Sequence, residues 1–175
     1  MAENDFRIGI PGAGASDFAT TPVAALNITK TPQKGPPPRG PINIIQAGDT
    51  PSLNGIDILT GPSVAPKFLW TPTALLTSTQ ARQLTRLFGW QQSQFRNQAD
   101  GKLRLIDETR FIDDYERQVH GRTLLAQFDE ADNAAQKYGY GVFNVVILLD
   151  PEFLQPSGAL LGDDTDTITF TLREV

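Results

Sequence analysis

Proline is distributed very unevenly along this chain, and this limits what the first third can fold into. Eleven of the thirteen prolines lie between Pro11 and Pro72. Residues 31–41 read TPQKGPPPRGP, which cannot form a helix or a central strand because proline fixes φ and lacks a backbone N–H. We therefore expect residues 1–66 to form an extended, proline-rich arm and residues 67–175 to form a folded domain.

Composition narrows the classes of partner and chemistry. Cysteine is absent, which excludes disulfides, thiolate nucleophiles and zinc–thiolate sites. The net charge is −5 and the pI is about 4.8. Arg82, Arg86 and Arg96 stand apart in the sequence, so the clustered basic residues of a phosphate-binding surface are not evident. We do not expect a nucleic acid partner.

Targeting and membrane signals are also missing from the sequence as read. The first residues, Met-Ala-Glu-Asn-Asp, are acidic and no apolar signal segment follows them. The longest apolar stretch, residues 145–149, is far shorter than the roughly 20 residues of a membrane-spanning helix. We expect the chain to be made in a cytoplasm, to stay soluble there, and not to associate with a membrane.

Aliphatic residues are strung through the expected arm, unlike a purely solvated tail. The proline tract would act as a spacer of about 3 Å per residue, giving it a reach on the order of 30 Å. We expect the arm to be mobile in the free protein and to become ordered against neighbouring subunits. The expected interface anchors are Ile42, Ile44, Ile45, Leu53, Ile56 and Ile58.

One amphipathic helix is predicted over residues 78–88. Thr77 and Gln80 fit the capping box, in which each side chain satisfies a backbone N–H of the other residue. Apolar residues recur at helical spacing after this cap, at positions 81, 84, 87 and 88. Gly89 is expected to end the helix in a left-handed conformation.

The remaining patterns predict strands. Alternation at residues 102–106 and the glycine at 101 suggest a hairpin with residues 94–98, and the apolar run at 142–149 suggests a buried central strand. Residues 116–128 suit a strand or a helix, and Thr123 and the glycine at 121 favour the strand. A further strand is expected at 167–172, and a polar loop or short helix at 129–141. The fold class is therefore mainly β, in the α+β class: an antiparallel β-sandwich or half-barrel with one flanking helix.

No residue set has the pattern of an active site, so we expect no enzyme and no catalytic, cofactor-binding or metal-ligating residues. His120 has neither a serine motif nor a thiol beside it. Paired carboxylates at 107–108 and 113–114 could serve acid–base chemistry, but interleaved arginines favour salt-bridged strand ends. The acidic turn at 163–166 lacks the glycine and distal glutamate of a calcium loop.

Aromatic residues gather around the predicted helix. Trp70 and Trp90 bracket it, with Phe68, Phe88 and Phe95 close in sequence. Such a group can stack on a sugar or base, or can pack between a helix and a sheet. Packing in a core is the commoner outcome for such clusters.

The order of these elements resembles a family of viral structural proteins. A proline-rich arm, Phe-Leu-Trp at 68–70, a capped helix, the segment 103–110 (LRLIDETR) and the segment 143–149 follow one another. This order resembles the tail proteins of long-tailed bacteriophages, and more narrowly the tail-tube and distal-tail group. The resemblance covers residues 67–175, whereas the arm departs from the simplest tube proteins.

The resemblance implies a pair of packed antiparallel sheets flanked by one helix. It also implies a structural virion protein of the phage tail: a tail-tube, distal-tail or tail-tip (baseplate) ring component. Its partners would be itself, in a ring of six subunits, and other tail proteins, after synthesis in the host cytoplasm. The alternatives are a phage neck or head-decoration protein, or a carbohydrate-binding module that uses Trp70, Trp90, Tyr138 or Tyr140.

Overall fold

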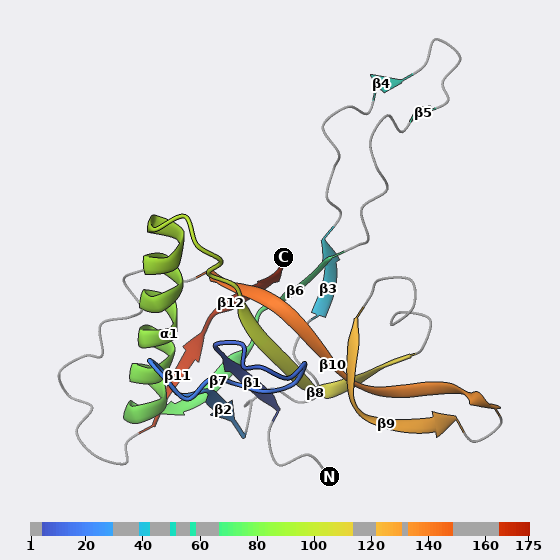
Figure 1. The fold of residues 1–175 in the computed structure, drawn as a ribbon, viewed down its shortest axis with the longest axis horizontal. Coiled ribbons are helices and arrows are strands. Elements are labelled where there is room, and N and C mark those ends of the chain that lie inside the picture. The colour runs from blue at the N-terminus through green and yellow to red at the C-terminus, as the bar shows by residue number, and fades with distance from the viewer. Residues whose placement is uncertain are drawn as a thin grey trace.

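One antiparallel sheet of eight strands dominates the computed structural model (Figure 1). The structure describes residues 5–29, 39–42, 50–51, 57–58, 67–113, 122–130, 133–148 and 165–175. The sheet has the order β2-β1-β8-β10-β12-β6-β3, and β9 also pairs with β10. Its strands are β1 (Phe6–Gly9), β2 (Leu26–Ile28), β3 (Arg39–Ile42), β6 (Lys67–Trp70), β8 (Leu103–Asp113), β9 (Thr123–Glu130), β10 (Asn133–Leu148) and β12 (Thr171–Glu174).

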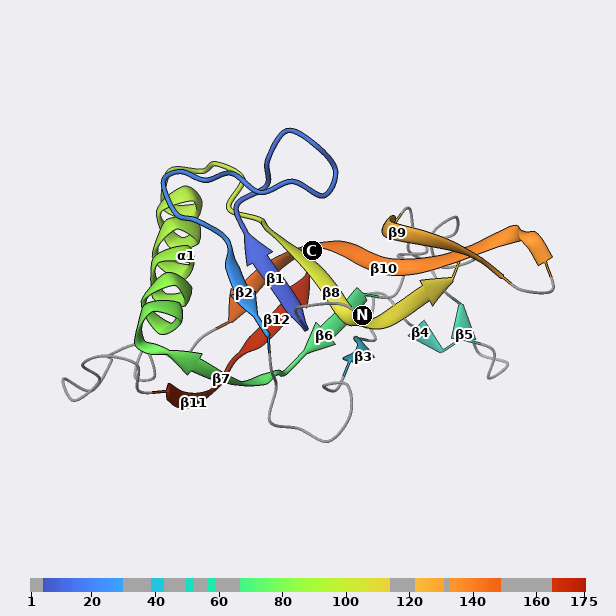
Figure 2. The same ribbon diagram turned by 90° about the horizontal axis from the view of Figure 1, so that it is seen from below.

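Two short strand pairs and one helix complete the described structure. Strand β7 (Thr73–Thr77) pairs with β11 (Thr165–Thr169), and β4 (Thr50–Pro51) pairs with β5 (Asp57–Ile58). The helix α1 spans Ser78–Arg96. Figure 2 shows α1 and the β7–β11 pair at one end of the molecule and the β9–β10 hairpin at the other. The predicted mainly-β class with a single helix is confirmed for the described residues, whereas the packing of two sheets as a sandwich stays a prediction.

The N-terminal residues belong to the core, which corrects the predicted arm. Strand β1 pairs with β8 on one side and β2 on the other. The side chains of Phe6, Ile8, Leu26 and Ile28 are completely buried. The prediction of an arm over residues 1–66 is therefore wrong for residues 5–29. These two strands are only three and four residues long, and an alternation of apolar and polar residues over so few positions is too short to be recognised in the sequence.

The later part of the predicted arm contributes an edge strand. Strand β3 pairs with β6 at the end of the sheet, with Pro41 opposite Phe68. Proline is tolerated there because an edge strand has one side without ladder hydrogen bonds. Strands β4 and β5 pair only with each other among the described strands, and Figure 1 shows them well away from the main sheet.

The predicted start of the helix is confirmed, and its predicted end is wrong. The Thr77 side chain accepts from the Gln80 backbone N–H, and the Gln80 side chain accepts from that of Thr77. The helix passes through Gly89 and ends at Arg96. There the Gln98 N–H donates to the carbonyl of Phe95 and the Ala99 N–H to that of Gln94, which is the Schellman pattern of a helix C-terminus.

The longer helix removes one predicted strand. Residues 94–96 form the last helical turn and not the first strand of a hairpin. The other predicted strand of that hairpin is part of β8. The helix extends past Gly89 because Gln91, about one turn after Leu87, continues the buried face that Leu84 and Leu87 begin.

Two further strand predictions also need correction. The polar loop or short helix expected at 129–141 is instead the end of β9 and the first half of β10. The strand expected at 167–172 is divided at Phe170 into β11, which pairs with β7, and β12, which lies between β10 and β6. The central strand expected at 142–149 is confirmed for residues 142–148, the second half of β10, between β8 and β12. Its expected burial does not hold for Asn144 and Leu148, which are exposed, and residue 149 lies outside the described residues. Of the strand expected at 116–128, β9 covers the part from Thr123 onward, and residues 116–121 lie outside the described residues.

Candidate interaction surfaces

The strands β8 and β10 are longer than the other strands of the sheet and extend past its edge. Asp107 pairs with Gly141, but the next pair along β8 is Phe111 with Tyr140. Residues 108–110 therefore have no counterpart on β10, and the ladder is irregular at this point. Beyond it, β10 continues between β8 and β9 as a long projection (Figures 1 and 2). We call residues 111–113 of β8, strand β9 and residues 133–140 of β10 the projection.

The buried carboxylate of Asp107 forms hydrogen bonds where the β8–β10 ladder becomes irregular. Asp107 is completely buried, and its Oδ2 accepts a 2.9 Å hydrogen bond from Nε1 of Trp70. Its Oδ1 accepts from the backbone N–H of Thr109 at 3.0 Å and also from the Thr109 hydroxyl. A buried carboxylate is tolerable only with such donors. Asp107 therefore joins β6 to the start of the projection.

The acidic pairs singled out in the sequence do not form an acid–base site in the described structure. Glu108, next to Asp107, forms an ion pair with Arg7 of β1 at 2.6 Å. Asp113 lies opposite Tyr138 in the projection. His120 and residues 114, 163 and 164 lie outside the described residues. Among the described residues, no three His, Cys, Asp or Glu side chains gather closely enough to hold a metal ion.

An aromatic patch lies on the projection. The rings of Phe111 and Tyr140 are stacked, with centroids 4.8 Å apart and planes 25° apart. Tyr138 meets Phe111 edge-on at 5.2 Å. Phe111 is 48% exposed, and both tyrosines are half-buried. We call Phe111, Tyr138 and Tyr140 the aromatic patch.

The tryptophans have a different environment from these rings. Trp70 is completely buried and lies 4.9 Å from Phe143 and 5.8 Å from Phe68, edge-on in both cases. Trp90 packs against the core and is partly buried. The alternative that Trp70 is a platform for sugar stacking is therefore wrong, and the packing of Trp70 in the core, which the sequence analysis favoured, is confirmed.

The base of the projection is tied to the last strand by Arg122. Its Nε and Nη2 donate to the two carboxylate oxygens of Glu174 at 3.2 and 2.9 Å. Its guanidinium carbon lies 4.1 Å from the ring centroid of Phe68, whose backbone N–H also donates to Glu174. Bidentate pairing and stacking on an aromatic face both favour arginine over lysine. The contacts link β9, β12 and β6.

A pocket of about 320 Å³ lies beside Arg122, with mainly polar walls. One wall contains Arg104, whose Nη1 donates to the carbonyls of Gly14 and Asp17 and so holds the loop that follows β1. Burial lowers the pKa of the Arg104 guanidinium, and the nearby Asp17 acts in the opposite direction. The lining residues are Ala15, Lys67, Arg104, Arg122, Thr123, Val142, Phe143, Asn144, Glu174 and Val175.

The interface residues predicted in the arm are only partly within the described structure. Ile42 is the last residue of β3, opposite Lys67, and Ile58 pairs with Thr50 in the β4–β5 hairpin. Ile44, Ile45, Leu53 and Ile56 lie outside the described residues. Their role as anchors stays a prediction.

Sequence reasoning found two of the three residues of the aromatic patch, because Tyr138 and Tyr140 were named there as possible stacking residues, and it missed Phe111. Tyr138 and Tyr140 have the two-residue spacing of side chains on one face of a strand, but the polar residues before them suggested a loop. Phe111 joins them only through the β8–β10 register, which brings it beside tyrosines 27 and 29 residues later in the chain. Period-two spacing of the tyrosines was the one local signal.

Comparison with known proteins found no relative of this chain. No family model, no curated protein and no solved structure matches the chain. No helix in the described part of the chain is long and apolar enough to cross a membrane. Over the ranges that it describes, the structure is mainly β with one helix and has a projection whose aromatic patch is partly exposed.

Proposed function

We propose that this chain is a structural subunit of a phage tail that acts through contacts between subunits. The observation that carries the proposal is the aromatic patch on the projection. The resemblance of residues 67–175 to tail-tube and distal-tail proteins supplies the particular assembly: a ring of six copies in the virion tail, in contact with other tail proteins.

The position of the patch supports a protein partner. Phe111 exposes about half of its surface, although the chain has a sheet core large enough to bury it. Exposed groups of aromatic rings mark interaction sites, and Tyr, Trp and Phe are enriched at the centres of protein interfaces. A projection held at its base by Asp107 and Arg122 can present such a patch to a neighbour at little cost in conformational entropy.

The ring geometry favours a protein over a sugar. In the Phe111–Tyr140 pair each ring already covers one face of the other, at 25° between planes. Tyr138 lies edge-on to Phe111. A sugar platform needs open ring faces, whereas a protein side chain packs against edges and faces alike. The carbohydrate-binding alternative would have to use this same patch or the partly buried Trp90, since Trp70 is buried.

The test measures association of the purified chain, alone and mixed with the products of neighbouring tail genes, by sedimentation velocity and native mass spectrometry. We expect rings for the wild type. Phe111→Ser should weaken association by about 1–3 kcal/mol, the range of a typical hot-spot residue.

Leu75→Ser is the matched control, because Leu75 is similarly exposed, at 44%, but lies on β7 away from the projection. A wild-type chain that stays monomeric in every mixture would overturn the proposal. Glycan binding that is lost in Tyr140→Ala, without any change in association, would replace it with the carbohydrate-binding alternative.

A further inference from the structure

The pocket beside Arg122 lies where strand β10 changes its neighbour along one edge. Strands β9 and β12 both pair with the edge of β10 that faces away from β8, one after the other. The pairs with β9 reach Val142, and the pairs with β12 begin at Val145. Phe143 and Asn144 lie between these two ladders, and both line the pocket. The pocket is therefore built into the sheet, at the break between two successive partners of β10.

Three cationic side chains line this pocket, and they come from three separate strands or strand ends. Lys67 is the first residue of β6, Arg104 belongs to β8, and Arg122 immediately precedes β9. Among the lining residues, Glu174 has the one carboxylate side chain. Three positive charges and one negative charge give the lining side chains a net charge of +2, in a chain whose net charge is −5.

Only one of the three cations is paired with a carboxylate. Arg122 forms the bidentate ion pair with Glu174. Within the described ranges, Lys67 and Arg104 form no ion pair. The Nη1 of Arg104 donates to two backbone carbonyls, which carry no formal charge. Asp17 attracts the Arg104 guanidinium, but Asp17 is exposed and does not line the pocket.

Both guanidinium groups are held in place by the protein itself. Arg104 is fixed by the two carbonyls of the loop that follows β1. Arg122 is fixed by Glu174, and its guanidinium carbon lies 4.1 Å from the ring centroid of Phe68 and 5.6 Å from that of Phe143. Groups that are already in place lose little conformational entropy when a ligand binds.

We propose that this pocket binds a small oxyanion of the phosphate class, either inorganic phosphate or the phosphoryl group of a small molecule. Lys67, Arg104 and Arg122 supply charged N–H donors from different strands, and the exposed amide of Asn144 adds a neutral donor. Donors that converge from several strands suit a tetrahedral anion. A planar carboxylate is best held by the fork of one arginine, and Glu174 already occupies the fork of Arg122.

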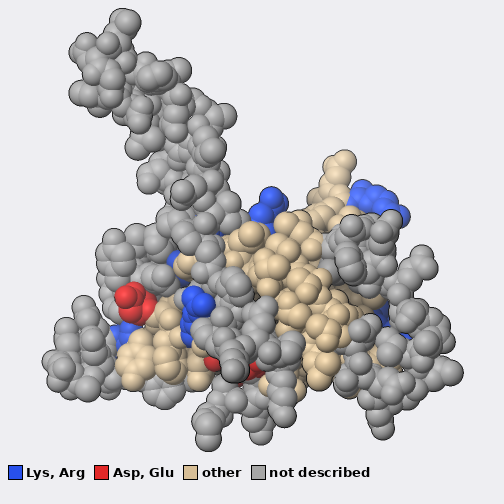
Figure 3. Space-filling model, turned by 180° about the vertical axis from the view of Figure 1, so that it is seen from behind, with Lys and Arg blue, Asp and Glu red and all other residues tan. Residues whose placement is uncertain are grey.

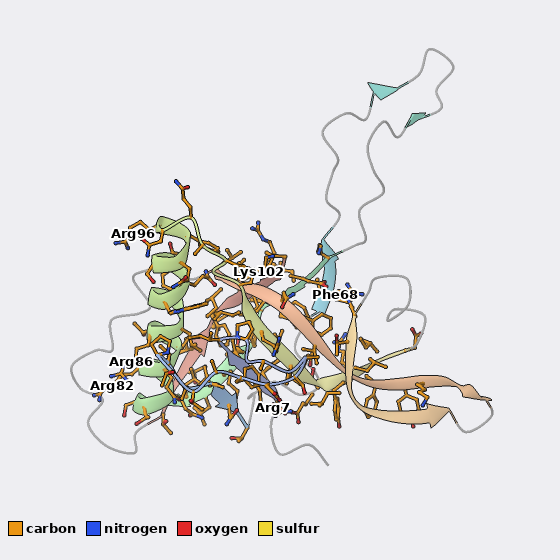
Figure 4. The ribbon with its side chains drawn as sticks, viewed as in Figure 1. Arg7, Phe68, Arg82, Arg86, Arg96 and Lys102 are labelled. Carbon is orange, nitrogen blue, oxygen red and sulfur yellow. The ribbon has the colours of Figure 1, made fainter. Side chains whose placement is uncertain are left out.

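The size and surroundings of the pocket favour a small anion over a nucleic acid. Its volume of about 320 Å³ leaves room for the anion and several waters. The view from behind shows basic side chains only at separated points of the described surface (Figure 3). Figure 4 shows Arg82, Arg86 and Arg96 along α1, away from Phe68, whose ring lies under Arg122. A nucleic acid needs a row of phosphate contacts along its backbone, which this distribution does not provide.

Titration of the whole chain with inorganic phosphate at constant ionic strength tests the proposal. Calorimetry gives the affinity, and ¹⁵N–¹H correlation spectra report the site. We expect saturable binding, with the largest chemical-shift changes at the Asn144 side-chain amide and the Nε–H of Arg122. Chemical-shift changes of equal size throughout the chain would contradict a defined site.

Two substitutions change the pocket without removing a contact that holds the fold. Within the described structure the side chains of Lys67 and Asn144 form no hydrogen bond or ion pair. Lys67→Gln removes a positive charge, and Asn144→Asp adds a negative charge at the same size. We expect each to weaken phosphate binding by at least about tenfold, since hydrogen bonds to charged groups are the strong ones.

Arg86→Gln and Gln92→Glu are the matched controls. They change the net charge by the same amount as the pocket variants, at exposed positions on α1. Because exposed charges away from the pocket are screened by salt, the affinity should stay within about twofold of the wild type. Thermal melting checks that all four variants are folded. Equal weakening in the controls and the pocket variants would overturn the proposal, because it would show only a general effect of net charge.

Methyl phosphate and acetate complete the test. Methyl phosphate that binds as tightly as inorganic phosphate would support a phosphoryl group on a larger molecule, and binding of inorganic phosphate alone would support the free ion. Acetate that binds as tightly as phosphate would overturn the choice of anion, as would the absence of saturable phosphate binding below about 10 mM. The proposal goes beyond the proposed function and does not depend on it, since phosphate binding is measured without any association of subunits.

Discussion

The side-chain amide of Gln91 makes the two backbone hydrogen bonds to Ile147 that a neighbouring strand would otherwise make. Its Oε1 accepts from the Ile147 backbone N–H at 2.9 Å, and its Nε2 donates to the Ile147 carbonyl at 3.0 Å. The β8–β10 ladder has ended by this point, since its last pair is Leu103 with Val145. The helix thus completes the hydrogen bonding of β10 where β8 stops.

Gln91→Leu should therefore destabilise the domain strongly. Leucine fits the buried site in size, but it leaves both backbone groups of Ile147 without a partner. Unsatisfied buried groups cost about 1–3 kcal/mol each, so we expect a loss of about 2–4 kcal/mol in urea unfolding. Gln92→Leu, at the exposed neighbouring position, is the control and should change stability by less than about 0.5 kcal/mol. Equal effects of the two substitutions would contradict the role of Gln91.

The Trp70–Asp107 hydrogen bond should show strong coupling. Trp70→Phe leaves a buried carboxylate without one of its donors, and Asp107→Ala leaves the indole N–H and the Thr109 groups unsatisfied. We expect each change to cost about 2–4 kcal/mol. A double-mutant cycle should give an interaction energy above about 1 kcal/mol. Additive effects would show that the two side chains act independently.

Gln98→Gly should stabilise the chain. Gln98 has a φ of 56°, in the left-handed region that costs a non-glycine residue about 1–2 kcal/mol, at the position of the Schellman turn where glycine is usual. Allowing for the greater freedom of glycine in the unfolded chain, we expect a gain of about 0.5–1 kcal/mol. Thermal unfolding measures it, with Gln98→Ala as the comparison that should bring no gain.

Gly141→Ala should disturb the base of the projection. A Cβ at this position would lie 2.4 Å from the ring of Phe143 and 3.2 Å from Ile112. Because Phe143 itself packs on Trp70, the ring cannot move without disturbing the core, and overpacking of this kind costs about 1–3 kcal/mol. Urea unfolding tests this, and Gly89→Ala is the control, since a Cβ at Gly89 meets nothing within 4 Å.

Removal of residues 1–29 should unfold the domain. This deletion takes away β1 and β2, and with them four completely buried side chains: Phe6, Ile8, Leu26 and Ile28. Each contributes about 1.5–3 kcal/mol of burial, so that the four together contribute about 6–12 kcal/mol. This loss is comparable with the whole stability of a typical domain, about 5–15 kcal/mol. Near-ultraviolet circular dichroism should lose the signal of the buried Trp70. A shortened chain that retains it would restore the arm interpretation.

The correct sequence predictions were those that depend on local chemistry. The Thr77–Gln80 capping box needs only four residues, and it fixed the start of α1. The apolar run in β10 needs only its own composition to indicate burial. By contrast, the end of α1 depends on Gln91 meeting Ile147, 56 residues away, so Gly89 was mistaken for a stop.

The missed features share a physical cause. The first half of β10 lies in the projection and lacks the apolar run that marks its second half, so its sequence resembles a loop. Strand β1 becomes recognisable only beside β8, with which it pairs edge to edge, and β2 becomes recognisable only beside β1. The aromatic patch likewise exists only once the β8–β10 register is known.

The first and last strands of the chain, β1 and β12, both lie inside the sheet, and this has a consequence for folding. Strand β12 lies between β10 and β6, so β6 and β3 remain detached from the rest of the sheet until residues 171–174 have been synthesised and have docked. Strand β1 must meanwhile wait for β8, about a hundred residues later in the chain. Such long-range pairing implies a high contact order and slow folding, in milliseconds to seconds for β proteins. The nascent chain therefore exposes unpaired strand edges through most of its synthesis, which is the state in which β proteins are most prone to aggregate.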